Sequence, residues 1–316
     1  MKIAVLDDYA RAALRLADWD GLGQVDVFAD PIARDDLPDK LAGYDVVCLM
    51  RERTPMDADL IAALPALRLI VTSGPRNASI DLDAARAAGV TVCGTESRKT
   101  TTSELAVLMM LALNRRLLPE VSALHAKGWQ VGLGRDVAGL TLGLIGLGNI
   151  GAQMATLGRA LGMDIVAWSP NLTADRCAAL DVARMDSLPD LMARADVTSV
   201  HMVLSDRTRG LVGADAFAAA RQGQVFINTS RGPLVDTDAL LNGLTAGRPA
   251  MAGLDVFDVE PLPMDDPLRD PDLIASGRLL LTPHLGYTTQ ETFRVFYTQT
   301  VEAIRAFQAG DPIRTI

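Results

Sequence analysis

The stretch that decides the fold is Leu142-Gly-Leu-Ile-Gly-Leu-Gly-Asn-Ile-Gly151. Its first four residues form an apolar run typical of a buried strand, and residues 152–161 follow a helical pattern. Glycines at 146, 148 and 151 have the spacing that lets a strand turn tightly into a helix whose N-terminus faces a pyrophosphate. A glycine-rich turn without a ligand is the alternative, but the strand–turn–helix context favours a dinucleotide site.

Short apolar runs alternate with helix-like stretches on both sides of this segment. Upstream, the runs that predict buried parallel strands are residues 3–6, 25–28, 46–50 and 69–72, separated by helical patterns such as 58–64 and 82–88. Around and after the glycines, the predicted strands are 141–145, 165–168, 197–202, 225–228, 253–256 and 279–282. This β-α-β alternation predicts an α/β protein with two doubly wound parallel sheets.

One long segment interrupts the alternation. Residues 100–116 predict a single helix rich in Leu, Ala and Met, which begins with a capping box at Thr101-Thr-Ser-Glu104. A connecting arm follows at 119–135, and the stretch 290–307 near the end is again helical in pattern. If this last helix packs on the first unit, one domain comprises residues 1–98 plus 286–316 and the other residues 99–285. A ligand-binding cleft is expected between two such domains.

Composition limits the class of protein. The 316-residue chain is 49% hydrophobic and 22% charged, as in a packed two-domain enzyme, and its net charge of −9 argues against a nucleic-acid surface. Cys48, Cys93 and Cys177 are isolated, which indicates reduced, buried thiols in a cytosolic protein. Acidic residues interrupt the N-terminal apolar run, and no apolar run approaches the ~20 residues of a membrane span. We therefore expect a soluble cytoplasmic protein without a metal site.

Three polar residues follow apolar runs in the last third of the chain: Arg231, Glu260 and His284. Hydride addition to a carbonyl carbon builds negative charge on the oxygen, which an arginine stabilises. A histidine can deliver the proton, and a neighbouring carboxylate keeps that histidine charged and fixes its ring. This set is the one needed to reduce a 2-oxo acid.

Each choice has a structural alternative. Arg231 could cap a strand end and pair with Asp236, and Glu260 could be a solvated loop acid. Of the other two histidines, His125 lies in the polar arm, and His201 begins a turn where a structural hydrogen bond is expected. His284 is therefore the predicted acid.

The strand at 165–168 should end in an acid that binds the adenosine ribose, but Ser169-Pro-Asn follows instead. Ser169 can bind a ribose hydroxyl, and nothing at this position repels a 2′-phosphate. Because the nearest cation in the sequence is Arg176, the cofactor is expected to be NAD, with NADP not excluded.

The chain resembles the D-isomer-specific 2-hydroxyacid dehydrogenases, the family of phosphoglycerate dehydrogenase and glyoxylate/hydroxypyruvate reductase. The resemblance covers nearly the whole chain. Its most specific segments are Gly146-Leu-Gly-Asn-Ile-Gly, His201-Met-Val-Leu-Ser-Asp-Arg-Thr-Arg-Gly, Ile227-Asn-Thr-Ser-Arg-Gly-Pro-Leu-Val-Asp, Gly253-Leu-Asp-Val-Phe-Asp-Val-Glu-Pro and Thr282-Pro-His-Leu-Gly.

The resemblance implies a flavodoxin-like substrate domain, a Rossmann cofactor domain and an NAD(P)-dependent oxidoreductase that interconverts a small 2-oxo acid and its D-2-hydroxy acid. It implies that Arg231 binds substrate and that His284 and Glu260 form the acid/base pair. A homodimer through the cofactor domain is also implied. The residues expected to bind the cofactor are Gly146, Gly148, Asn149, Ile150, Gly151, Ser169, Thr229, Ser230, Asp255 and Gly286.

The substrate end departs from the family pattern. The loop that should take the substrate carboxylate is expected to use Ser73 and Gly74, but Pro75, Arg76 and Asn77 replace its usual small residues. Together with Arg51, Arg76 suggests a 2-oxo acid with a second polar or anionic group. The alternative is that Arg76 pairs with Asp81 or Glu52.

Tyr287 stands where the family often has a small residue, and its contact with substrate stays open. Two rival functions also stay open. One is a same-fold dehydrogenase of the phosphite or formate type. The other is an NAD(H)-binding sensor without turnover, like the corepressors that resemble this family.

Overall fold

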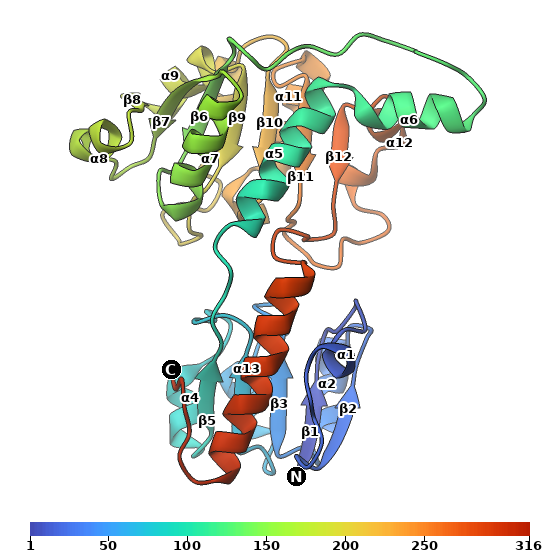
Figure 1. Cartoon of the computed structure of the whole chain (residues 1–316), viewed down its shortest axis with the longest axis vertical. Coiled ribbons are helices and arrows are strands. Elements are labelled where there is room, and N and C mark those ends of the chain that lie inside the picture. Colours follow the sequence, from blue (N-terminus) through green and yellow to red (C-terminus); the bar gives the residue numbers. More distant parts are fainter. The chain divides into compact units, whose positions relative to one another are not determined.

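The computed structural model describes all 316 residues and divides the chain into two compact units. Unit 1 comprises Met1–Arg98 and Thr288–Ile316, and unit 2 comprises Lys99–Tyr287. Each unit contains one sheet whose strands are all parallel (Figure 1). The prediction of two doubly wound parallel sheets is confirmed.

Unit 1 has five strands in the order β2-β1-β3-β4-β5. They are β1 (Lys2–Val5), β2 (Gln24–Val27), β3 (Val46–Leu49), β4 (Leu69–Thr72) and β5 (Thr91–Gly94). The helices are α1 (Ala13–Leu16), α2 (Leu37–Leu41), α3 (Ala58–Ala62), α4 (Leu82–Ala87), α13 (Gln290–Gln308) and the 3-10 turn η1 (Arg34–Asp36).

Helices cover both faces of this sheet, so β3 and β4 are buried along their whole length. One face packs against α2, α3 and α4, and α13 packs on β4, β5 and α1 (Figure 1). A buried hydrogen bond 2.9 Å long from the Tyr297 hydroxyl to Asp8 Oδ1 ties α13 to the segment after β1.

Unit 2 has seven strands in the order β12-β11-β10-β9-β6-β7-β8. They are β6 (Thr141–Ile145), β7 (Asp164–Trp168), β8 (Ala183–Arg184), β9 (Val197–Val200), β10 (Val225–Asn228), β11 (Met251–Leu254) and β12 (Leu279–Leu281). The helices are α5 (Thr101–Asn114), α6 (Leu117–His125), α7 (Asn149–Ala160), α8 (Ala174–Ala179), α9 (Leu188–Arg194), α10 (Ala214–Ala219), α11 (Thr237–Ala246), α12 (Pro271–Ala275) and the 3-10 turns η2 (Gly232–Leu234) and η3 (Pro267–Arg269).

The unit 2 sheet is also covered on both faces. Helices α5 and α7 pack on one face (Figure 1), while α9, α10 and α11 bury the other face against a second apolar cluster. The strand order reverses between β6 and β9, and ligands of doubly wound sheets bind at the carboxyl ends of the strands beside such a reversal. These ends carry most of the predicted cofactor residues.

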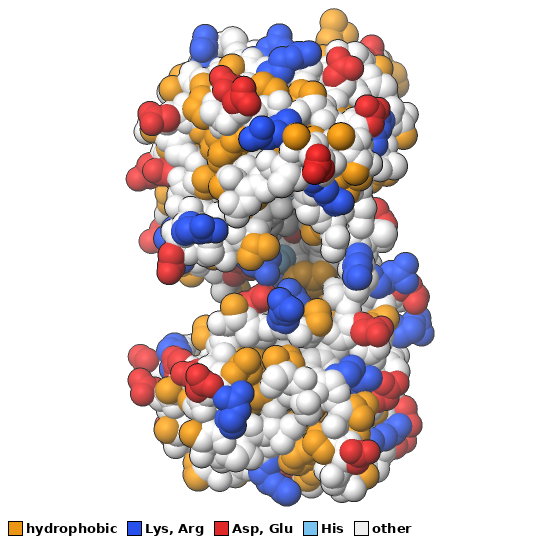
Figure 2. Space-filling model, turned by 90° about the vertical axis from the view of Figure 1, so that its left-hand side faces the viewer, with side chains coloured by type: hydrophobic (Ala, Val, Ile, Leu, Met, Phe, Trp, Pro, Cys, Tyr) orange, Lys and Arg blue, Asp and Glu red, His pale blue; other side chains and the backbone are white.

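The structure also describes features that bear on the class of protein. The three cysteines are buried and unpaired. None of the helices combines the length and apolar character that a membrane span requires. On the face drawn in Figure 2, basic and acidic side chains are interspersed over both units.

Two local predictions were wrong. The capping box required Thr101 to be the N-cap of helix α5, but Thr101 is already the first helical residue. Thr100 is the N-cap instead, and its side chain makes no capping hydrogen bond. The segment expected to be a connecting arm begins with helix α6 instead. A helix is possible there although it contains Pro119, because the proline lies in the first turn, where the backbone N–H has no partner within the helix. The short strands β5 and β8 were not predicted.

His201 directly follows β9, and its backbone N–H donates to the carbonyl of Ile145 over 2.7 Å. Both ring nitrogens are buried, and neither has a hydrogen-bond partner, so the structural hydrogen bond expected for this ring is absent. Burial lowers the pKa of His201 to about 3. The ring is therefore neutral at neutral pH.

We predict that His201 makes the folded protein less stable in mild acid. In the unfolded chain its pKa is roughly 6.5, so between about pH 6.5 and 3 the unfolded state binds more protons and stability falls as pH falls. When the pH falls from roughly 7 to 5, the free energy of unfolding of His201→Gln should decrease by about 2 kcal/mol less than that of the parent. Urea unfolding at each pH measures this difference. His125→Gln, at an exposed position, is the control. Parallel pH profiles for His201→Gln and the parent would contradict the burial argument.

Candidate active site

The centre of the candidate site is a short hydrogen-bonded pair between the side chains of His284 and Glu260. The distance from His284 Nδ1 to Glu260 Oε2 is 2.6 Å, and both side chains are largely buried, with 16% and 24% exposed. The other carboxylate oxygen, Oε1, accepts the backbone N–H of Phe257 over 3.0 Å. The carboxylate is thus fixed from the backbone side and in turn fixes the orientation of the imidazole.

The backbone of His284 is in the left-handed region, with φ of 56°. A residue with a Cβ reaches this region at a cost of roughly 1–2 kcal/mol, so the surrounding structure must hold it there. The backbone N–H of His284 donates to the carbonyl of Thr282, only two residues earlier, over 3.0 Å. This tight turn directs the imidazole toward Glu260.

Asp255 anchors the loop that carries His284. Its side chain is fully buried just after β11 and accepts hydrogen bonds from Thr282 Oγ1 (2.6 Å), Leu285 N (2.7 Å) and Gly286 N (2.8 Å). Burial raises the pKa of Asp255, and the three hydrogen bonds act in the opposite direction. Sequence reasoning treated Asp255 and Gly286 only as cofactor-binding residues and missed this anchoring of the loop from both sides of His284.

Arg231 lies on the loop after β10, which Asn228 ties down. Asn228 Nδ2 donates to the carbonyl of Arg231 (2.9 Å), and Asn228 Oδ1 accepts the N–H of Ser230 (3.0 Å). The hydroxyl of Ser230 donates to the carbonyl of Val200 at the end of β9. These bonds fix the direction in which the chain leaves the sheet.

The loop that carries Arg231 and the loop that carries Glu260 are in direct contact. A Cβ on Gly232 would lie 2.2 Å from the carbonyl carbon of Phe257, so only glycine fits there. Phe257 is also the residue whose N–H binds Glu260. The structure therefore brings the three predicted catalytic residues onto adjoining loops of one unit.

The glycine loop after β6 is shaped by three close approaches. Gly146 has φ of +101°, and a Cβ there would lie 2.4 Å from the carbonyl oxygen of His201; a Cβ on Gly151 would lie 2.2 Å from the carbonyl oxygen of Gly146. A Cβ on Gly148, by contrast, would meet no atom within 4 Å and would project into open space. Gly148 therefore leaves open space beside the loop, which a larger residue would occupy.

The residues around this open space have the chemistry that a dinucleotide requires. Helix α7 begins at Asn149, and its N-cap Gly148 has no side chain to satisfy the first N–H groups of the helix, which include those of Asn149 and Ile150. Uncapped N–H groups and the positive end of the helix dipole favour a phosphate. At the end of β10, the hydroxyl of Thr229 is buried without a hydrogen-bond partner, as expected of a group that binds a ligand.

In unit 1, Arg51 holds the predicted substrate loop. Its backbone N–H donates to Ser73 Oγ (2.9 Å), and its guanidinium donates to the Ser73 carbonyl (3.2 Å). A Cβ on Gly74 would overlap this guanidinium. Asn77, which sequence reasoning treated only as a departure from the family, is buried and donates to the carbonyl of Arg51 (2.6 Å).

Arg76 is exposed and forms neither of the ion pairs considered as its alternatives. Asp81 instead caps helix α4 by accepting the N–H of Ala84, and Glu52 lies 3.6 Å from Arg51. In unit 2, the ring of Tyr287 packs edge-on against the imidazole of His284, with 5.1 Å between centroids. Tyr287 therefore bounds one side of the His284 ring.

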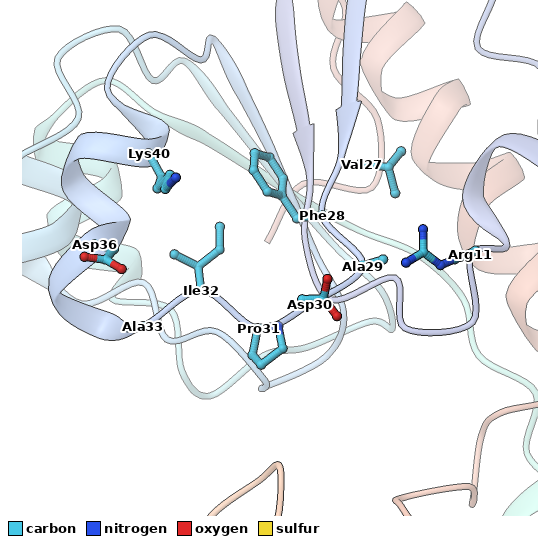
Figure 3. A pocket seen from close by; sticks show the side chains of 10 residues that line it. All are labelled: Arg11, Val27, Phe28, Ala29, Asp30, Pro31, Ile32, Ala33, Asp36 and Lys40. Carbon is cyan, nitrogen blue, oxygen red and sulfur yellow. The ribbon is translucent and has the colours of Figure 1, made fainter.

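A separate cavity of about 390 Å³ lies in unit 1 at the end of β2 (Figure 3). Its apolar wall includes Phe28 and Ile32, and the side chains of Arg11 and Lys40 lie on opposite sides of it. None of the predicted site residues lines this cavity.

Comparison with known proteins assigns the family. Residues 107–286 match the model of the NAD binding domain of the D-isomer specific 2-hydroxyacid dehydrogenases. The chain is 33% identical to the hydroxypyruvate reductase of Thermotoga maritima over 284 residues, which cover 89% of this chain and 90% of the relative. It is 35% identical over 266 residues to the D-3-phosphoglycerate dehydrogenase of Mycobacterium tuberculosis, covering 83% of this chain and 49% of that one.

The chain thus spans about half the length of the D-3-phosphoglycerate dehydrogenases it matches. Among solved structures, a phosphoglycerate oxidoreductase from Vibrio cholerae O395 superposes with a TM-score of 0.90 and 34% identity, covering 98% of this chain and 99% of the other. The family model alone matches more than half of the chain, and the structural likeness extends over both units. This protein belongs to the D-isomer specific 2-hydroxyacid dehydrogenase family.

Proposed function

We propose that the protein is an NAD(P)-dependent oxidoreductase that interconverts a small 2-oxo acid and its D-2-hydroxy acid. The observation that carries the proposal is the 2.6 Å pair between His284 and Glu260, beside the loop of Arg231. Because Glu260 occupies Nδ1 of the imidazole, the other ring nitrogen, Nε2, exchanges the proton with the substrate oxygen.

The roles divide among the three side chains. Arg231 stabilises the negative charge that grows on the substrate oxygen, His284 protonates that oxygen, and Glu260 holds the imidazolium in position. A bound nicotinamide dinucleotide supplies or accepts the hydride. Unit 2 would hold this cofactor through its glycine loop, Thr229 and Ser230, with Asp255 and Gly286 beside the nicotinamide half.

We assign substrate binding to unit 1, where Ser73 and Gly74 would bind the carboxylate of the substrate. Relatives are named hydroxypyruvate reductase, glycerate dehydrogenase and D-3-phosphoglycerate dehydrogenase. Arg76, which is exposed on the same loop and has no ion-pair partner, suits a substrate with a second polar or anionic group. Arg51 supports the loop instead, since its guanidinium is engaged with Ser73 and Glu52.

We expect His284→Ala to lower kcat about 100- to 10,000-fold, the usual contribution of a general acid. Glu260→Gln should also lower kcat, because the amide cannot stabilise the imidazolium. The measurement is loss of reduced-nicotinamide absorbance with glyoxylate, hydroxypyruvate, pyruvate or 2-oxoglutarate. His125→Ala is the control, and cofactor binding should persist in every variant. Turnover by His284→Ala within about threefold of the parent would refute the acid role.

We expect Arg76→Ala to raise KM about tenfold for 2-oxo acids with a second anionic group, since a charge-assisted contact is worth roughly 1.5–3 kcal/mol and solvent reduces it at an exposed site. Glyoxylate, which has no such group, should be unaffected. The matched control is Arg86→Ala, another exposed arginine of unit 1 that pairs with Asp83. Unchanged kinetics of Arg76→Ala on every substrate would remove Arg76 from substrate selection.

We also propose a homodimer formed through unit 2. Helix α6 and the following arm expose an apolar surface that a monomer would leave in water: Leu117, Leu118, Val121, Leu124, Trp129 (73% exposed), Val131 and Leu133 (95% exposed). A second copy of the same surface would bury it, because a two-fold interface is self-complementary.

Light scattering should give twice the chain mass of 33.7 kDa for the parent protein. Leu133→Asp should shift the mass toward one chain, because it places a charge in the buried surface. Met264→Asp, at another exposed apolar position of unit 2, should not. A parent protein that stays monomeric at the highest soluble concentration would contradict the dimer.

A further inference from the structure

The turn after β7 lacks the carboxylate that selects NAD. Ser169 stands in its place, is partly buried, and its hydroxyl makes no hydrogen bond within the chain. The carbonyl of Trp168, one residue earlier, accepts the N–H of Gly146 over 2.8 Å. Ser169 therefore lies directly beside the start of the glycine loop, where the adenosine ribose of a dinucleotide binds in such folds.

Arg176 reaches this same place from helix α8. Its Nε donates to the carbonyl of Leu147, between the first two glycines of the loop, over 3.2 Å. Arg176 is not adjacent to Ser169 in sequence, and folding brings its guanidinium onto the glycine loop, 29 residues earlier in the chain. It forms no ion pair with a carboxylate of the chain, so its terminal N–H groups remain available for an anion.

A second arginine braces the other side of the turn. Arg184 donates from Nε to the carbonyl of Leu172 over 3.1 Å and likewise forms no ion pair. The acidic neighbour Asp175 directly precedes Arg176 on α8, and adjacent residues of a helix do not face each other. The turn thus combines a free hydroxyl with two unpaired arginines.

We propose that this turn binds the 2′-phosphate of NADP(H), with Arg176 as the specificity-determining residue and Ser169 as a second donor. A phosphate takes N–H groups from a guanidinium in a fork geometry, whereas the usual carboxylate would repel it. The expectation of NAD depended on the absence of an adjacent cation, and the position of Arg176 removes that premise. The inference rests on the proposed function, because it concerns the cofactor of that reaction.

The test is a set of dissociation constants for NADPH and NADH, measured by nucleotide fluorescence without substrate. The parent should bind NADPH at least about tenfold more tightly than NADH. Arg176→Ala should weaken the binding of NADPH about 10- to 100-fold, as expected for charge-assisted hydrogen bonds. The dissociation constant for NADH should stay within about threefold of the parent value. Ser169→Asp should reverse the preference. In the parent, 2′,5′-ADP should compete with NADPH for binding and 5′-AMP should not. In Arg176→Ala, the competition by 2′,5′-ADP should be lost.

The matched control is Arg159→Ala. Arg159 also donates to backbone carbonyls, those of Leu180 and Asp181, but it lies near the end of α7 remote from the glycine loop. An NADPH-to-NADH ratio that Arg176→Ala leaves unchanged, or a parent that prefers NADH, would overturn the inference and leave the oxidoreductase proposal standing. Failure to bind either dinucleotide would overturn both.

Discussion

The arrangement of the candidate site depends on one buried carboxylate. Asp255 directly follows β11 and accepts hydrogen bonds from residues on both sides of His284, namely Thr282, Leu285 and Gly286. An intramolecular hydrogen bond typically contributes roughly 0.5–1.5 kcal/mol, so three of them together offset the roughly 1–2 kcal/mol cost of the left-handed backbone at His284. Without this anchor the chain after β12 would relax, and the imidazole would lose its fixed direction.

The second constraint is the close approach of loops that leave neighbouring strands. At Gly232 the backbone meets Phe257, and at Gly146 and Gly151 it meets His201 and the loop itself. None of these positions has room for a Cβ, whereas Gly148 borders open space. Glycines in this unit therefore have two roles. Gly146, Gly151 and Gly232 permit close contact between backbones, and Gly148 leaves room for a ligand.

Much of this arrangement could be predicted from the sequence, because it follows from local patterns. Buried parallel strands are continuous apolar runs, so β3, β4, β6 and β10 were found to within one residue. The glycine spacing and its strand–helix context likewise indicated the turn into α7. The strand β8 has two residues and α6 contains a proline, so neither gives a clear periodic signal.

The sequence could not predict which arginine side chains form hydrogen bonds or ion pairs within the protein and which remain available for a ligand. Arg51, Arg76 and Arg176 are the same type of residue; the first two follow the apolar runs of β3 and β4, and the third lies in helix α8. Folding directs Arg51 onto Ser73 and Gly74, leaves Arg76 without an ion-pair partner, and brings Arg176 onto the glycine loop. These outcomes depend on contacts between segments distant in the chain, which no local pattern encodes. A guanidinium that meets a backbone carbonyl through Nε keeps its charge and its terminal donors, so Arg176 is at once a structural brace and a group that can bind an anion.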